Sequence, residues 1–231
     1  MSTGFALTPA VRMGLSISVA TGLYGISFGA LAVAAGLHVW QALALSALMF
    51  TGGSQFAFIG VIAGGGAGSA AVGAATLLGV RNAVYGMQMN RLLQPRGWRK
   101  WLAAHLTIDE SAATASGQID AAEQQRGFWT AGVGVFVLWN AFTLCGALLG
   151  DALGDPRQWG LDGAAVAAFL GLLWPRLQQR EPVALAVLYG VVTDLAVPLL
   201  PPGPPILLAA LVGAAWGWWR SARLQQDGRP A

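Results

Sequence analysis

Long apolar segments, separated by short polar or glycine-rich stretches, make up most of the chain. They cover residues 13–36, 41–63, 69–93, 128–150, 161–175, 182–200 and 204–219. An α-helix needs about 20 residues, each rising about 1.5 Å, to cross the hydrocarbon core of a bilayer. The first four segments reach this length, whereas 161–175 and 204–219 are short enough to be half-spans or re-entrant segments. The pattern predicts an all-α, polytopic transmembrane helix bundle of about seven spans.

The composition supports a protein embedded in a lipid bilayer. Charged residues make up 10% of the 231 residues and hydrophobic residues 55%, whereas soluble domains carry about 25% charged residues. The net charge is +3, and the Lys and Arg residues lie between the apolar segments. A nucleic-acid site needs such residues on one face, so we expect no nucleic-acid partner. Cys145 is the single cysteine, and we expect no disulfide, metal or cofactor.

The cations also predict an orientation. They gather after the third, fifth and last segments, within residues 91–126, 176–180 and 220–229. Cytoplasmic loops carry an excess of Lys and Arg. With seven spans, an amino terminus on the outside places all three stretches in the cytoplasm. We therefore expect an outside amino terminus and a cytoplasmic segment at residues 94–126.

A weak internal similarity suggests that the chain consists of two halves. Gly29-Ala30-Leu31 resembles Gly146-Ala147-Leu148, and Leu78-Gly79-Val80 resembles Tyr189-Gly190-Val191. Halves of three spans each enter the membrane from opposite sides, as in the inverted repeats of many secondary transporters. The expected halves of the single domain 1–231 are residues 12–93 and 127–200, followed by a last span at 201–220. Chance similarity between apolar sequences is the alternative.

Glycines spaced four residues apart occur in several segments. The pairs are Gly25/Gly29, Gly60/Gly64, Gly146/Gly150 and Gly213/Gly217. Small residues at this spacing allow helix backbones to approach closely in lipid. We predict close helix packing at each pair.

The second apolar segment contains a run of small and polar residues, Thr51-Gly52-Gly53-Ser54-Gln55-Phe56. Each glycine weakens a helix by about 1 kcal/mol relative to Ala. Irregular backbone at membrane depth is tolerated only where it faces protein or a water-filled cavity. One interpretation is a broken helix whose free N–H groups bind a substrate carboxylate. The other is a kink at which Ser54 and Gln55 bond neighbouring helices.

Two charged residues lie inside apolar segments, Arg81 and Asp194. A buried cation costs at least about 2.5 kcal/mol on insertion scales, so it needs a partner or a function. Arg81, Tyr85 and Gln88 share one helical face, with Asn82 beside them. Arg81 and Asp194 suit the carboxylate and the ammonium of a zwitterion. They suit each other equally well as a structural ion pair.

Four elements together resemble the AzlC family of branched-chain amino-acid permeases. They are Gly25-Ile26-Ser27-Phe28-Gly29, the run from Phe50 to Phe56, Arg81 with its polar neighbours, and Thr107-Ile108-Asp109-Glu110-Ser111. The resemblance covers roughly residues 10–220. It implies export of branched-chain amino acids across the bacterial cytoplasmic (inner) membrane, with a small AzlD-type membrane subunit as partner. Asn82 departs from the family pattern, in which a histidine is expected, so a proton role at this position is not carried over.

The sequence therefore favours the large subunit of an exporter for hydrophobic, valine-like amino acids. The expected substrate-binding residues are Thr51, Gly52, Gly53, Ser54, Gln55, Phe56, Arg81, Asn82, Tyr85, Trp139 and Asp194, and the expected coupling or gating residues are Asp109 and Glu110. A membrane-embedded enzyme is an alternative, but the apolar segments contain no catalytic set. A non-transporting membrane scaffold is the other alternative, and it would not need Arg81 and Asp194 at membrane depth.

Overall fold

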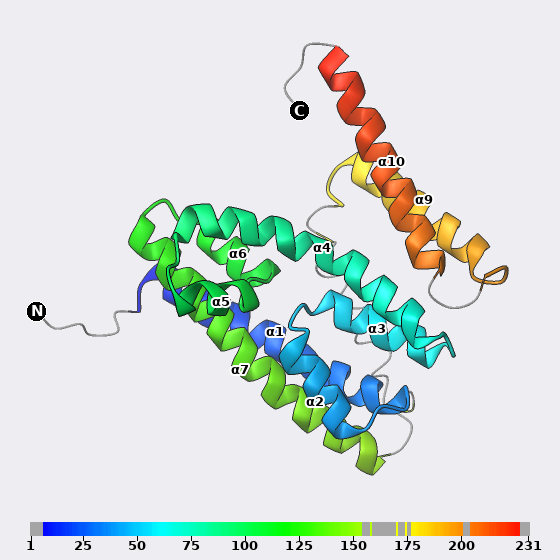
Figure 1. Ribbon diagram of the computed structural model, residues 1–231, viewed down its shortest axis with the longest axis horizontal. Helices are drawn as coiled ribbons and strands as arrows, with labels where there is room; N and C mark the ends of the chain where they lie inside the picture. Colours follow the sequence, from blue (N-terminus) through cyan, green and yellow to red (C-terminus); the bar gives the residue numbers. More distant parts are fainter. Residues whose placement is uncertain are drawn as a thin grey trace, which may run out of the picture.

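The computed structural model describes residues 7–153, 158, 170, 174, 177–200 and 204–226. Its helices are α1 (Pro9–Ala34), α2 (Val39–Leu48), α3 (Gly53–Ala63), α4 (Gly68–Leu93), α5 (Trp98–His105), α6 (Asp109–Ser116), α7 (Ala121–Leu153), α9 (Arg180–Ala196) and α10 (Pro204–Gln226) (Figure 1). The described residues contain no strand, which confirms the predicted all-α class. Most of the segment expected at 161–175 lies outside the described residues, so that expectation stays a prediction.

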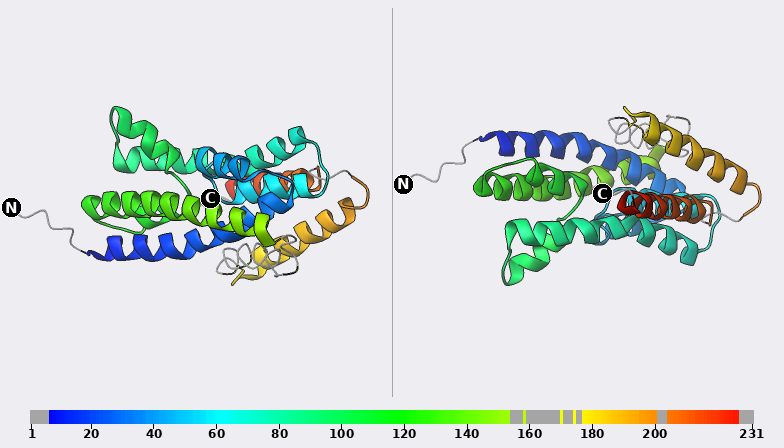
Figure 2. Two further views of the ribbon diagram at one scale, coloured as in Figure 1. Left: turned by 90° about the horizontal axis from the view of Figure 1, so that it is seen from below. Right: turned by 90° about the horizontal axis from the view of Figure 1, so that it is seen from above.

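The central pair of helices is α1 and α7, which run in the same direction (Figures 1 and 2). Near the start of both helices, Gly14 lies against Thr130, and near their ends Ala30 lies against Gly150. The contacting residue numbers increase together along the two helices, so α1 and α7 are parallel. Among the described residues, α1 and α7 are also the helices long and apolar enough to cross a membrane.

Glycines allow the backbones of α1 and α7 to touch. A methyl group added at Gly25 would lie 2.7 Å from the Trp139 carbonyl oxygen, and one at Gly150 would lie 3.0 Å from the Ala30 Cα. The close packing predicted at Gly25/Gly29 and Gly146/Gly150 is therefore confirmed. Gly60 and Gly217 have no atom within 4 Å of such a methyl group among the described residues, whereas Gly213 lies against the Tyr189 side chain. Close packing is therefore absent at Gly60 and Gly217 within this part of the chain.

The segment predicted as one span at 41–63 is a hairpin of two short helices, α2 and α3. Gln55 of α3 donates hydrogen bonds from Nε2 to the carbonyl oxygens of Leu45 and Ser46 in α2, at 3.0 and 3.2 Å. The chain therefore turns back after α2. The turn includes Gly52, whose φ of 61° and ψ of −89° strain a residue with a side chain.

Helices α5 and α6 form a second hairpin. Gln88 of α4 donates from Nε2 to Ser116 Oγ at 3.1 Å, while Arg81 of α4 reaches Asp109 at the start of α6. α4 and α6 thus run in the same direction, and α5 leads the chain back from the end of α4 to Asp109. α6 also packs on α7, where Thr114 meets Gly127. The middle of the segment expected at 94–126 is therefore packed against the bundle.

The order of the elements repeats, but not with the expected boundaries. α1 and α4 each have 26 residues, run in opposite directions and are each followed by a hairpin of two short helices (Figures 1 and 2). Halves at 12–93 and 127–200 would require α1 and α7 to cross in opposite directions, whereas these helices are parallel. The expected halves are therefore not confirmed: their boundaries rested on apolar similarity between α1 and α7, and they did not anticipate the two hairpins.

The same directions bear on the expected orientation. The start of α1, the end of α4 and the start of α7 lie at one end of the bundle (Figure 2). An outside amino terminus and a cytoplasmic segment after α4 would place these ends on opposite sides of a membrane. The expectation counted the α2–α3 hairpin as a full crossing, and the side on which this end lies stays a prediction.

The last two described helices, α9 and α10, pack against each other in opposite directions. Glu181 near the start of α9 pairs with Arg220 of α10, and the Tyr189 ring lies against Gly213. α10 also contacts α4. Asp194 lies on the exposed side of α9.

Candidate functional site

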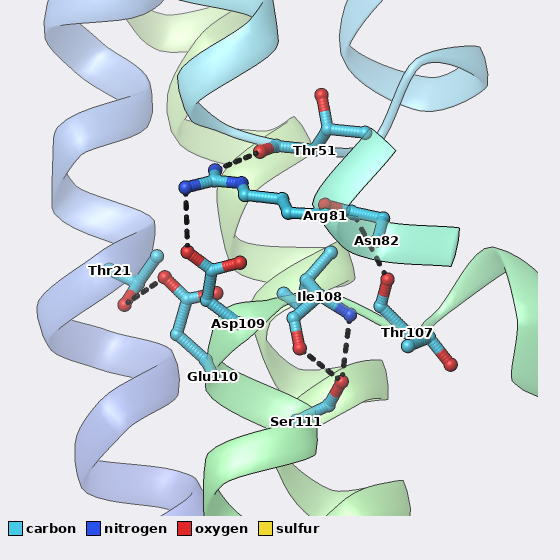
Figure 3. Close-up of polar contacts among 9 residues, drawn as sticks. All are labelled: Thr21, Thr51, Arg81, Asn82, Thr107, Ile108, Asp109, Glu110 and Ser111. Atoms are coloured by element: carbon cyan, nitrogen blue, oxygen red, sulfur yellow. Dashed lines mark hydrogen bonds and ion pairs between the residues drawn. The ribbon is translucent and has the colours of Figure 1, made fainter. Parts of the chain in front are cut away.

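The tips of the two hairpins meet at the middle of α4 (Figure 3). Arg81 donates from Nη2 to the Thr51 carbonyl oxygen at 3.4 Å, and Asn82 donates from Nδ2 to the Thr107 carbonyl oxygen at 3.2 Å. Thr51 and Thr107 each stand two residues before the second helix of their hairpin. Two neighbouring side chains of α4 therefore hold the two opposed tips.

Arg81 joins both hairpins at once. Besides its bond to Thr51, it forms an ion pair from Nη1 to Asp109 Oδ2 at 3.0 Å. Both side chains are partly exposed, at 40% and 31%, so the pair is open to competition by a ligand. The sequence offered Asp194 as a structural ion-pair partner of Arg81. In the structure, the partner of Arg81 is Asp109.

The predicted helix break at Gly52-Gly53 is confirmed, since α2 ends at Leu48 and α3 begins at Gly53. No side chain caps the start of α3. The first N–H groups of a helix have no partner inside the helix and favour an anion. Ser54, in this first turn, is 1% exposed and its Oγ has no hydrogen-bond partner among the described residues.

The start of α6 is built differently. Ser111 Oγ accepts from the Ile108 N–H at 3.0 Å and donates to the Leu106 carbonyl oxygen at 2.7 Å, which fixes the tip. Asp109 and Glu110 occupy the first turn, where carboxylates interact favourably with the helix dipole. Glu110 Oε1 accepts a hydrogen bond of 3.4 Å from Thr21 Oγ1 in the middle of α1. Both acidic side chains thus face neighbouring helices.

Several polar atoms at this junction are buried without a hydrogen-bond partner in the described residues. They are Ser54 Oγ, Arg81 Nε, Asn82 Oδ1 and Asp109 Oδ1. Buried polar groups in native proteins almost always have partners, so each exception needs an explanation. The set contains a cationic donor and an anionic acceptor, which a zwitterionic ligand would satisfy together.

Aromatic residues surround the junction in two groups. Trp139 is 3% exposed and stacks on Phe28, with ring centroids 5.9 Å apart, while Phe56 meets both rings edge-on. Phe50 from one tip and His105 from the other both contact Phe136 of α7. Tyr85 packs against the adjoining core. The expected pocket residues Phe56 and Trp139 therefore lie together, and Tyr85 borders the core from α4.

The structure adds residues that the sequence alone did not single out. Thr107, Thr21 and Phe136 contact the predicted residues across helices that are distant in sequence. Thr107 lay inside a quoted motif, but nothing in the sequence indicated that its carbonyl group would face Asn82. Asp194 makes no ion pair with Arg81 in the described part of the chain, and its substrate role stays a prediction.

Comparison with known proteins identifies the family of the chain. The family described as AzlC protein matches residues 16–153, from within α1 to the end of α7, and the match includes every residue of the junction. The chain belongs to the AzlC family. It is accordingly a membrane protein of a branched-chain amino-acid transport family, and this family is of a transporter type rather than an enzyme type. No curated protein and no solved structure matches the chain.

Proposed function

We propose that this AzlC-family chain is the large subunit of an exporter for hydrophobic, valine-like amino acids. The observation that carries the proposal is the junction at Arg81, where the tips of two hairpins meet around an ion pair. Arg81 Nε and Asp109 Oδ1 of this pair have no hydrogen-bond partner among the described residues. Transporters place their substrate sites near the membrane midplane, at interrupted helices.

The two ends of an amino acid have distinct binding groups at this junction. The substrate carboxylate would bind the Arg81 guanidinium, with the uncapped first turn of α3 and Ser54 Oγ beside it. The ammonium would bind Asp109, whose Oδ1 has no other partner among the described residues. We choose Asp109 over Asp194 because Asp109 already touches Arg81. An apolar side chain would contact Phe56 and Trp139.

Opposed hairpins supply a route from each side of the membrane to one site. Irregular backbone is tolerated at membrane depth where it lines a cavity or is buried in protein. Withdrawal of the α2–α3 tip would expose Arg81 to one side, and withdrawal of the α5–α6 tip would expose it to the other. This is the geometry that alternating access requires.

The proposed orientation has the start of α1 in the cytoplasm of a bacterial cell, with the protein multi-pass in the inner membrane. The cations at this end of the bundle are Arg12, Arg91, Arg96, Arg99, Lys100 and Arg126. The connections at 35–38 and 64–67, at the opposite end, contain no Lys or Arg. The positive-inside rule then places the amino terminus inside.

A small AzlD-type membrane subunit is the proposed partner. Gly60 of α3 and Gly73 and Gly86 of α4 each have open space around them within the described residues, and small residues favour helix association in lipid. Valine exchange by this chain alone, in liposomes that contain no other protein, would contradict the need for a partner.

Exchange of labelled valine in liposomes tests the substrate site. Arg81→Ala should abolish exchange, and Arg81→Lys should restore little of it because an ammonium cannot bind two oxygens as a guanidinium does. Arg126→Ala is the matched control, since Arg126 pairs with Glu123 away from the junction. Exchange at the wild-type rate in Arg81→Ala would refute the proposed site.

A further inference from the structure

The junction holds more carboxylates than cations. Arg81 pairs with Asp109, and the adjacent Glu110 has a hydrogen bond from the Thr21 hydroxyl group. Figure 3 shows both carboxyl groups below the guanidinium, on the side of α1. Among the described residues, one guanidinium therefore faces two acidic side chains.

Each helix around Glu110 can be checked for a second cation. Asp109 of its own helix and Arg81 of α4 are the charged groups that act on it, and α1 contributes the Thr21 hydroxyl group. On α7, Gly127 and Gly132 lie against the α5–α6 hairpin, and the charged neighbour Arg126 pairs with Glu123. No second cation faces Glu110 in the described ranges, so a cation bound there must come from solution.

A proton, a metal cation such as Na⁺ or the ammonium group of a substrate can occupy this position. Ionisable side chains at membrane depth commonly bind the protons that pumps and transporters move. Glu110 is partly buried, and a carboxylate removed from water without a balancing cation tends to take up a proton instead. Glu110 differs in this respect from Asp109, whose charge Arg81 balances.

We propose that Glu110 binds the proton that this exporter exchanges for its amino acid. The inference rests on the proposed transport function. With the site empty, Glu110 carries the proton on its carboxyl group and Arg81 holds Asp109. When the substrate carboxylate takes Arg81, Asp109 is released and the substrate ammonium enters beside Glu110. The O–H bond of Glu110 then breaks, the proton passes to water on the same side, and the ammonium is held by both carboxylates.

The opposite step occurs after the site opens to the other side. The amino acid leaves, Arg81 returns to Asp109, and Glu110 takes a proton from water on that side. Each transported amino acid is thus exchanged for one proton, and an inward proton gradient drives export.

Two transport assays on one preparation test the inference. Liposomes contain this chain with the small partner subunit proposed above. In the first assay, labelled valine enters against unlabelled valine without a gradient. In the second, an acidic interior drives labelled valine inward. For Glu110→Gln we expect the first to continue and the second to fall to the leak of empty liposomes. Glu123→Gln, which changes an acid that pairs with Arg126 at the start of α7, should behave as wild type in both.

The outcomes separate the inference from the proposed function. If the wild-type chain exchanges valine but does not respond to the gradient, or if Glu110→Gln still responds, the inference is overturned and the transport function stands. If the wild-type preparation exchanges no valine, the proposed function fails and the inference fails with it.

A measurement on the wild-type chain covers the case in which Glu110→Gln does not fold. Valine added to purified protein in weak buffer should release a proton, detected with a pH-sensitive dye. Thr21→Val removes the hydroxyl group bonded to Glu110 without changing charge, and it should shift the pH dependence of this release. No release from the wild-type chain, or an unchanged pH dependence in Thr21→Val, would overturn the assignment to Glu110.

Discussion

The α1–α7 pair and the hairpin junction are built in opposite ways. Along α1 and α7, glycines bring two long helices into backbone contact, and Ser18 and Thr143 are fully buried with hydrogen-bond partners. At the junction, two hairpin tips touch α4 through few polar contacts, and buried polar atoms have no partner in the described residues. A close-packed interface resists change, whereas contacts that a ligand can replace permit it. We therefore expect α1 and α7 to form the stable part of the protein and the two hairpins to form its movable part.

Side-specific labelling gives the largest expected effect, because its result is all or none. The comparison requires α1 and α7 to be parallel, with hairpins that enter from opposite ends. In a Cys145→Ser background, Leu7→Cys and Ile119→Cys should react with an impermeant maleimide from the same side of inverted vesicles, and Gly65→Cys from the other side. Labelling of positions 7 and 119 from opposite sides would show that α1 and α7 do not start on the same side of the membrane.

Overpacking the α1–α7 interface should have the next largest effect. Gly146 lies against the Ile26 backbone, so Gly146→Val should destabilise the protein by about 3 kcal/mol or prevent its folding. The measurement is thermal unfolding in detergent. Gly73→Val is the control, since a Cβ at Gly73 meets nothing within 4 Å in the described chain. Equal losses in both variants would show that α1 and α7 are not the stable region.

A substitution at the tip of the α2–α3 hairpin should cost less stability. Gly52 has a φ of 61°, and a side chain in such a conformation costs about 1–3 kcal/mol. Gly52→Ala should therefore lower the unfolding temperature moderately while it reduces valine exchange strongly, because the tip carries Thr51 to Arg81. Gly36→Ala, at another positive φ outside the junction, should lower stability and leave exchange unchanged.

The smallest effect on stability is expected at the ion pair. Partly exposed pairs contribute about 1 kcal/mol or less. Removal of one partner leaves an unbalanced charge, whereas removal of both can be nearly neutral. Arg81→Ala and Asp109→Ala should each lower the unfolding temperature slightly, and the double variant should be close to wild type while it binds no valine. Near-native valine binding by the double variant would show that Arg81 and Asp109 do not bind the substrate and that their ion pair is structural.

The sequence predicted the parts of this structure that depend on local composition. Long apolar segments predicted α1, α4 and α7. The spacing of Gly25 and Gly29 predicted a close helix contact, and Gly52-Gly53 predicted a helix break. A charge in an apolar segment also marked Arg81 correctly as unusual. Each of these signals lies within a single continuous segment of the chain.

The sequence did not reveal where the chain turns back. α5 and α6 have eight residues each, too short for an apolar pattern, and Asp109 with Glu110 made them resemble a solvated loop. A Gly-Gly pair fits a kink and a reversal equally well, so 41–63 was counted as one crossing. The partner of Arg81 was missed for the same reason, because Asp109 comes close only when the second hairpin folds back.

The adjacent positions of Arg81 and Asn82 have a mechanical consequence. Successive residues of a helix are separated by about 100° of rotation and about 1.5 Å of rise, yet these two side chains hold tips that arrive from opposite ends. A displacement of α4 at residues 81 and 82 therefore acts on both hydrogen bonds at once. The two hairpin tips are mechanically coupled through a single turn of one helix.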